Sequence, residues 1–271
     1  MKKLIAVFVA LAALAAFAAT PAHAVRPFIT DDAAIIGHQR MEVANWLYAD
    51  KESLQIWHSL NYGLTPWVEL TVAGFHGALQ SADGEHWKYA FTAPLLQAKF
   101  LLHDYEPNGL PGVTFAVGSD LPWGNEPFDG ESFKAPGYGA FSFVSVTQCI
   151  GADEEVLLHG QIGGTYVRDD GENRTGLVWG LGTQYRIYKG LHGVAELING
   201  DPYAEGSSGF MYQIGFRQFI TNDFQIDLAY GSGVGGNPES RANSWISSGI
   251  RWVVDFNKSK GKKFAPNGRR L

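Results

Sequence analysis

The chain has 271 residues, with 21 basic and 27 acidic side chains and a formal charge of −6. Aromatic residues make up 13 % of the chain and charged residues 18 %, which excludes a disordered protein because disordered chains are poor in aromatics and rich in charge. The acidic balance argues against nucleic-acid binding, the single cysteine, Cys149, excludes a disulfide scaffold, and a mean hydropathy of −0.09 argues against a helical membrane protein.

Residues 1–24 have the pattern of a secretory signal peptide. Lys2 and Lys3 precede an apolar run over residues 4–19, and Ala-His-Ala at 22–24 is a small-x-small cleavage site. The apolar run is shorter than the ~20 residues that a membrane-spanning helix needs. We therefore predict a bacterial protein that is exported across the inner membrane and matures to residues 25–271.

Residues 25–38 come before the first strand pattern, and we expect them to form an N-terminal periplasmic arm. Asp31 and Asp32 lie in this arm. Two adjacent carboxylates fit a turn or a solvated arm best, with a cap on the periplasmic mouth or a bound cation as alternatives.

Residues 39–256 alternate between apolar and polar positions. In the clearest stretch Phe224, Ile226, Leu228 and Tyr230 share one face, and the residues between them share the other. The same period of two recurs over residues 177–187, 210–217 and 246–256. A period of two predicts a sheet with one apolar face and one polar or small-residue face.

This alternation fits a soluble sandwich or an outer-membrane barrel, and two further features favour the barrel. Several runs reach about 10 residues, the length that a tilted strand needs to cross a bilayer. Aromatic residues stand at the ends of the predicted strands, where the girdles of an outer-membrane barrel lie, although β-propensity alone also enriches strands in aromatics. These residues are Trp46, Tyr48, Tyr62, Trp67, Trp87, Tyr89, Tyr188, Tyr230, Trp245 and Trp252.

Turn lengths also alternate along the chain. Short turns fall at 63–66, 189–193 and 221–223, whereas the segments between these hairpins, such as 121–137 and 231–243, are longer and rich in Gly, Pro, Asp and Ser. Short turns at one rim and long loops at the other are typical of bacterial outer-membrane barrels. The segment 121–137 either folds inward as a constriction or forms an external loop.

We predict an all-β fold, a closed antiparallel transmembrane β-barrel of about 12 strands over residues 39–256, with 10–14 strands compatible with the pattern. The predicted strand centres are Val43, Ile56, Val72, Leu96, Val117, Phe143, Gln161, Gly182, Glu196, Ile214, Ile226 and Ile250. Residues 257–271 form a basic C-terminal tail with six Lys or Arg and no acidic residue. We expect this tail to be solvated.

The sequence Arg26-Pro27-Phe28-Ile29-Thr30-Asp31-Asp32 resembles the mature N-terminus of a bacterial family usually labelled "MetA-pathway of phenol degradation" or "transporter". The resemblance continues through Met41-Glu42-Val43 and the Tyr62-Gly63-Leu64-Thr65 turn. It implies an outer-membrane barrel that passes aromatic or other hydrophobic compounds, and it brings no catalytic or binding residues to transfer. The strand 245–256 also looks like the aromatic-ended signal that the outer-membrane assembly machinery reads, although 15 residues follow Phe256.

The polar face supplies the candidate lumen residues. A ring that mixes arginines with carboxylates sets a transverse field that selects small polar or charged solutes, unless the side chains pair across the lumen and close it. The candidates are Gln55, Glu69, Gln97, Lys99, Gln161, Gln184, Arg186, Glu196, Gln213, Arg217, Asp227 and Arg251.

We therefore predict a porin-like channel of the bacterial outer membrane for passive passage of small, hydrophobic or aromatic molecules. Its expected partners are outer-membrane lipid, the assembly machinery and small solutes, with no nucleic acid and no cofactor or metal. A closed barrel for structure or surface interaction is the first alternative. A barrel enzyme acting on lipid is the second, and the absence of a GxSxG motif argues against it, so we expect no enzymatic activity.

Overall fold

The computed structural model describes residues 27–81, 84–127, 133–151, 154–169, 171–203, 209–235 and 244–256. The predicted signal peptide, 1–24, and the basic tail, 257–271, lie outside these ranges. No helix in the described ranges is long and apolar enough to cross a membrane.

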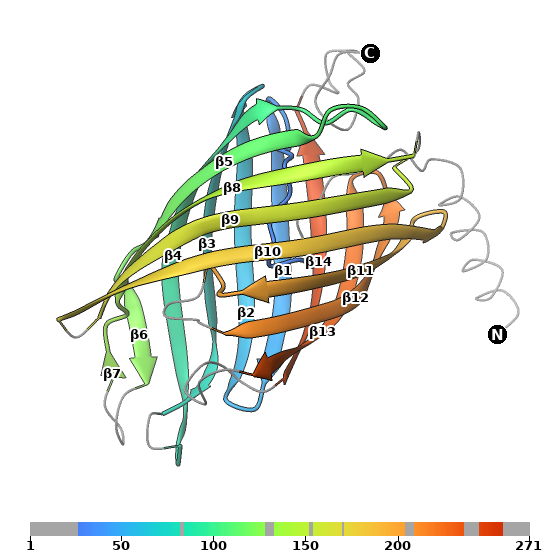
Figure 1. Cartoon of the computed structure of the whole chain (residues 1–271). Helices are drawn as coiled ribbons and strands as arrows, with labels where there is room; N and C mark the ends of the chain where they lie inside the picture. The colour runs from blue at the N-terminus through green and yellow to red at the C-terminus, as the bar shows by residue number, and fades with distance from the viewer. Residues whose placement is uncertain are drawn as a thin grey trace, which may run out of the picture.

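Twelve strands form a closed antiparallel barrel (Figure 1). Consecutive strands pair side by side, the last strand pairs with the first, and a further pairing of β3 with β4 completes the ring. The strands are β1 (Arg40–Asp50), β2 (Ser53–Thr65), β3 (Val68–Gln80), β4 (Trp87–His103), β5 (Gly112–Asp120), β8 (Tyr138–Ile150), β9 (Val156–Asp169), β10 (Glu172–Tyr188), β11 (Leu191–Asn199), β12 (Phe210–Thr221), β13 (Phe224–Gly235) and β14 (Ser244–Asp255). The predicted fold class and strand number are confirmed, and each predicted centre lies within one of these strands.

The alternation of the sequence becomes an apolar outer wall and a polar interior. On β13 the outward-facing Leu228 is 53 % exposed, whereas its neighbour Asp227, which faces the interior, is 5 % exposed. On β14 Ile250 and Arg251 repeat this contrast. A soluble sandwich would bury the apolar face against a second sheet. Here the apolar face is the exposed one, so the exposed outer surface matches the apolar, lipid-facing band of a membrane barrel.

The two rims differ as the turn lengths predicted. The turns that join β2 to β3, β10 to β11 and β12 to β13 contain two residues each. They lie at the same rim, because an even number of the twelve barrel strands precedes each turn. The described residues of the segment 121–137 lie at the opposite rim and include two short strands, β6 (Gly124–Pro127) and β7 (Phe133–Lys134). Since β6 pairs with β4 at Phe91 and Thr92, this part of the segment extends the wall.

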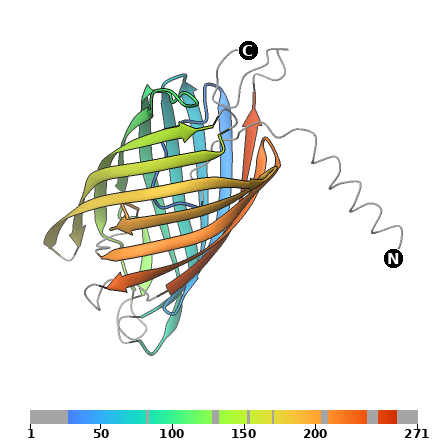
Figure 2. The same ribbon diagram turned by 45° about the vertical axis from the view of Figure 1, so that its right-hand side comes forward.

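The residues before β1 lie inside the barrel. Figure 2 shows this stretch, coloured dark blue, within the ring of strands. Residues 27–38, which we call the lumenal segment, are the described part of the expected periplasmic arm, and most of them are buried. The backbone of the lumenal segment lies against interior side chains of several strands. The segment therefore fills part of the barrel interior.

Candidate functional site

The barrel wall holds the lumenal segment through its backbone amides. The amides of Ile29 and Thr30 donate to the two carboxylate oxygens of Glu196 on β11, both at 2.9 Å. The amide of Asp31 donates to Oε1 of Gln161 on β9 at 2.6 Å. A segment without regular structure leaves its amides without backbone partners, and these polar wall side chains supply acceptors for them.

Two glycines of β10 make room for the segment. A Cβ atom on Gly180 would lie 2.2 Å from Oγ1 of Thr30, and one on Gly182 would lie 3.3 Å from the ring of Phe28. The glycine-rich interior face of β10 is therefore the surface on which residues 28–30 pack, because any larger residue at 180 would collide with the segment.

A buried ionic cluster joins the segment to the opposite wall. Nζ of Lys99 on β4 lies 2.7 Å from Oδ1 of Asp31 and 3.3 Å from Oδ1 of Asp32. Lys99 is 1 % exposed, so its charge is fully removed from solvent. Further along, the amide of Ile36 donates to Oε2 of Glu69 on β3 at 2.7 Å. The segment thus crosses the lumen, from β11 at Ile29 to β3 at Ile36.

Two arginines complete the contacts of the interior. Arg217 of β12 donates to Oε1 of Gln184 at 2.5 Å, and its guanidinium carbon lies 5.6 Å from the centre of the Phe28 ring. Arg251 of β14 makes a two-point contact with Oε2 of Glu42 on β1, from Nε and Nη2, each at 2.7 Å. Each charged group thus meets a polar, ionic or aromatic partner, as the burial of charge requires.

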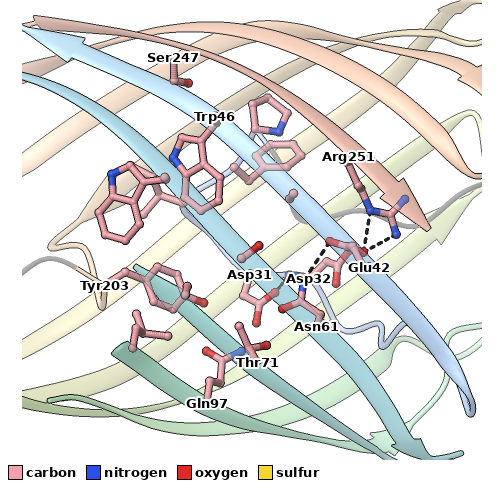
Figure 3. Close-up of a pocket in the computed structure, with 18 of the residues that line it drawn as sticks. Asp31, Asp32, Glu42, Trp46, Asn61, Thr71, Gln97, Tyr203, Ser247 and Arg251 are labelled. Carbon is pink, nitrogen blue, oxygen red and sulfur yellow. Dashed lines mark hydrogen bonds and ion pairs between the residues drawn. The ribbon is translucent and has the colours of Figure 1, made fainter. Parts of the chain in front are cut away.

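A cavity of about 200 Å³ remains between the lumenal segment and the wall of β1 to β4 and β14. We call it the lumenal chamber (Figure 3). Its polar lining includes Gln55, Ser59, Asn61, Thr71 and Gln97, and its aromatic lining comes mainly from β1, β2 and β14. The segment packs tightly on β10 and leaves this space on the other side. The chamber is therefore an unfilled part of the described interior, with room for a small solute.

The aromatic lining corrects part of the sequence analysis. Trp46, Tyr48 and Trp245, which we expected in the outer girdles, line the chamber, and Trp245 is 3 % exposed. The prediction was wrong because it used position along the strand and ignored phase: Trp46 and Tyr48 share a face with Glu42. The other residues predicted for the girdles are exposed outside the barrel: Tyr62, Trp67, Trp87, Tyr89, Tyr188, Tyr230 and Trp252.

The structure brings the candidate lumen residues together as follows. Nine are buried, namely Glu69, Lys99, Gln161, Gln184, Glu196, Gln213, Arg217, Asp227 and Arg251. Gln55, Gln97 and Arg186 are partly buried, and the first two line the chamber. Several of the nine hold the lumenal segment. Sequence reasoning placed polar residues on this face but missed Tyr203, which follows β11 and reaches the chamber.

Oδ1 of Asp31 and Oδ1 of Asp32 both form ion pairs with the Lys99 ammonium group. Within the described ranges, no group of three or more His, Cys, Asp or Glu side chains is arranged to hold a metal ion.

The outer wall carries one polar pair relevant to the enzyme alternative. Nδ1 of His58 on β2 lies 2.6 Å from Oδ1 of Asn45 on β1, and the His58 ring stacks on His76 with 5.3 Å between centres. An asparagine that orients a histidine is one part of a hydrolytic site, which also needs a nucleophile. Neither Asn45 nor His76 is one of the serine, cysteine or threonine nucleophiles that an adjacent histidine base activates in such a site.

No protein-family model matches this chain, and no curated protein is similar to it in sequence. Solved structures with a similar fold do exist. An outer membrane channel from Pseudomonas putida F1 superposes with a TM-score of 0.65 at 13 % identity, covering 82 % of this chain and 98 % of that one. The KdgM porin gives 0.52 at 8 % identity, covering 78 % and 98 %. The same porin in complex with disordered oligogalacturonate gives 0.53 at 8 % identity, with the same coverage.

The fold and the interior together define a twelve-stranded barrel of the kind found in outer-membrane channels and porins. At these identities the likeness is one of fold.

Proposed function

We propose that this protein is a channel of the bacterial outer membrane through which small hydrophobic or aromatic molecules pass without an energy source. The lumenal chamber carries the proposal: it is the space that the segment leaves inside a closed barrel, and tryptophans line it. An exposed apolar wall supports placement in lipid. The channel fold of the neighbours supports the same class of function.

The proposal includes the route to the membrane. We propose that residues 1–24 direct export, that the assembly machinery inserts the barrel through its last strand, and that outer-membrane lipid surrounds it. The short-turn rim faces the periplasm in this arrangement, as in bacterial barrels generally. The N-terminal motif that resembles the MetA-pathway family supplies residues 27–32 of the lumenal segment, and on that resemblance we propose membership of the family.

The candidate lumen residues have two roles in this proposal. Gln161 and Glu196 position the segment through its amides, so they set the size of the passage without lining it. Gln55 and Gln97 line the chamber and would meet a solute.

The first experiment is single-channel recording of the refolded chain 25–271 in planar bilayers. Discrete and reproducible steps support a channel, and reversible block by small aromatic solutes supports the substrate class. A matched variant tests the path: Trp57→Ala in the chamber is expected to weaken the block, whereas Trp67→Ala on the outer surface is expected to leave it unchanged.

A closed structural barrel is the second candidate, and the buried cluster of Lys99, Asp31 and Asp32 favours it because it fixes the segment across the lumen. A protein that shows the heat-dependent gel migration of a folded barrel but conducts no current would support this candidate and contradict the channel.

A further inference from the structure

The lumenal chamber has an aromatic side. Trp46 of β1 and Trp57 of β2 stack with 5.5 Å between ring centres and an interplanar angle of 6°. Next to them Tyr48 of β1 stacks on Trp245 of β14 at 6.3 Å. All four residues line the chamber. The quadrupole of an aromatic ring makes its face partly negative, so the face attracts cations as well as packing against apolar rings.

The charged part of the lining is mainly acidic. Five carboxylate residues and two basic residues line the chamber: Asp31, Asp32, Glu42, Glu69, Asp201, Lys99 and Arg251. Both basic side chains are already engaged, Arg251 with Glu42 and Lys99 with the two aspartates. The lining therefore has an excess of acidic groups. In a narrow space with low-dielectric walls such an excess concentrates cations.

One carboxylate oxygen has unused capacity for a hydrogen bond. Asp31 is 1 % exposed, and its Oδ1 accepts from Lys99 and from the amide of Asp32. Its Oδ2 is buried and accepts no hydrogen bond from any described residue. Figure 3 shows Asp31 pointing into the chamber. Oε1 of Gln97, another lining residue, is also buried and accepts no hydrogen bond from any described residue. A buried acceptor without a donor is costly, which points to a ligand with N–H groups.

We propose that the lumenal chamber selects organic cations, namely small ring-bearing or alkyl ammonium ions, from the solutes that reach it. The aromatic side holds the apolar part and attracts the charge. Asp31 and Gln97 accept hydrogen bonds from the ammonium group, and the acidic excess rejects carboxylated solutes. This inference rests on the proposed function and adds the charge of the preferred solute to it.

Binding tests the inference without requiring conduction. The refolded chain 25–271 in detergent micelles is titrated with benzylammonium, benzyl alcohol and benzoate, and tryptophan fluorescence reports occupancy because Trp46, Trp57 and Trp245 line the chamber. These three probes share one ring and differ in charge. We expect benzylammonium to bind roughly tenfold more tightly than benzyl alcohol, and benzoate to bind most weakly.

Variants locate the effect. Asp31→Asn keeps the shape of the side chain and removes its charge, and Trp57→Leu removes one aromatic face. Each is expected to reduce the preference for benzylammonium over benzyl alcohol, whereas Trp67→Leu, on the outer surface, is expected to keep it. Equal binding of the amine and the alcohol by the unmodified chain overturns the inference. An unchanged preference in both Asp31→Asn and Trp57→Leu also overturns it.

A measurement on the unmodified chain covers the case in which the variants do not fold. The reversal potential in a potassium chloride gradient is expected to show cation selectivity, and anion selectivity would overturn the inference. The two proposals fail separately. A chain that prefers benzylammonium but conducts no current contradicts the channel and keeps the site, whereas a chain that conducts without preferring the amine keeps the channel and contradicts the site.

Discussion

Lys99 and its two aspartate partners are the residues that tie the lumenal segment to the β4 side of the barrel. All three side chains are removed from solvent, so each charge depends on the others for compensation. A buried ion pair adds little net stability over an apolar replacement, but the loss of one partner leaves an uncompensated charge. The cluster is therefore best understood as a lock that holds one position of the segment.

Replacement of Lys99 tests this lock. Lys99→Met leaves Asp31 and Asp32 buried without a cation, and we expect the free energy of holding the segment to fall by about 3–5 kcal/mol. Limited proteolysis of the folded barrel measures this loss, because residues 27–38 should be cleaved faster in Lys99→Met than in the unmodified chain. The triple variant Lys99→Met, Asp31→Asn, Asp32→Asn removes the unpaired charges and should recover much of the protection. Equal protection in Lys99→Met and the unmodified chain would contradict the lock.

Asp31 also predicts a dependence on pH. Burial raises the pKa of the Asp31 carboxyl to about 6, against the pull of Lys99, and Asp32 adds to the rise. In the released segment the pKa is about 3.9. The docked form therefore binds more protons between pH 4 and 6, so docking is strongest at low pH and weakens as the pH rises through 6.

Comparing the protease protection of the segment at pH 4.5 and pH 7.5 tests whether docking weakens as the pH rises. We expect stronger protection at pH 4.5, and a smaller difference between the two values in Asp31→Asn. A matched variant of an exposed acidic group, Glu52→Gln, should keep the full difference. Protection that rises with pH in the unmodified chain would show that the ion pair with Lys99 outweighs the effect of burial.

At the scale of elements, the interior face of β10 determines how closely the segment packs. Gly180→Val would place a side chain on Thr30, and we expect it to push residues 28–30 away from β10 toward the lumenal chamber and lower the single-channel conductance. The matched control is Gly233→Val on β13, because a Cβ atom at 233 meets nothing within 4 Å. An unchanged conductance for Gly180→Val would mean that the segment does not limit the passage.

The strands could be predicted from sequence because their signal is local. Alternation in β13 and β14 fixes both the strand and the face that points outward, and the turn lengths order the rims. The position of the segment is not a local property. Thr30 finds its acceptor 166 residues away on Glu196, and Gln213 donates to the carbonyl of Pro27 across 186 residues. No periodicity in residues 25–38 reports such contacts, so the sequence predicts an N-terminal periplasmic arm but not its position in the lumen.

The sequence carries a signal for the aromatic lining of the chamber, namely the phase of the aromatic residues within β1. Trp46 and Tyr48 stand in the polar phase of β1, with Glu42 and Ala44, so phase alone assigns them to the interior. Tyr203 offered no such signal, because it lies in a loop and reaches the chamber by tertiary packing against Phe141 and Phe143.

At the scale of the whole molecule, the polar interior and the apolar exterior indicate which medium surrounds the barrel. The exposed belt of leucine, isoleucine and aromatic side chains would be a large apolar surface in water, where such surfaces drive association. In a bilayer the same belt faces acyl chains, and the cost of a charged substitution depends on its depth. The depth profile of such substitutions therefore separates a membrane barrel from a soluble one.

Leu228 and Tyr62 provide a matched pair for this profile. Leu228 lies outward near the middle of β13, whereas Tyr62 lies outward near the short-turn end of β2. We expect Leu228→Arg to lower the free energy of unfolding in lipid vesicles by about 2–4 kcal/mol, and Tyr62→Arg to lower it by about 0–1 kcal/mol from depth alone. Reversible unfolding in urea with vesicles present measures both. The same pair in detergent micelles should show a smaller difference, because a micelle adapts its shape around a charge. Equal costs at the two positions in vesicles would contradict the placement of this wall in lipid, and with it the channel.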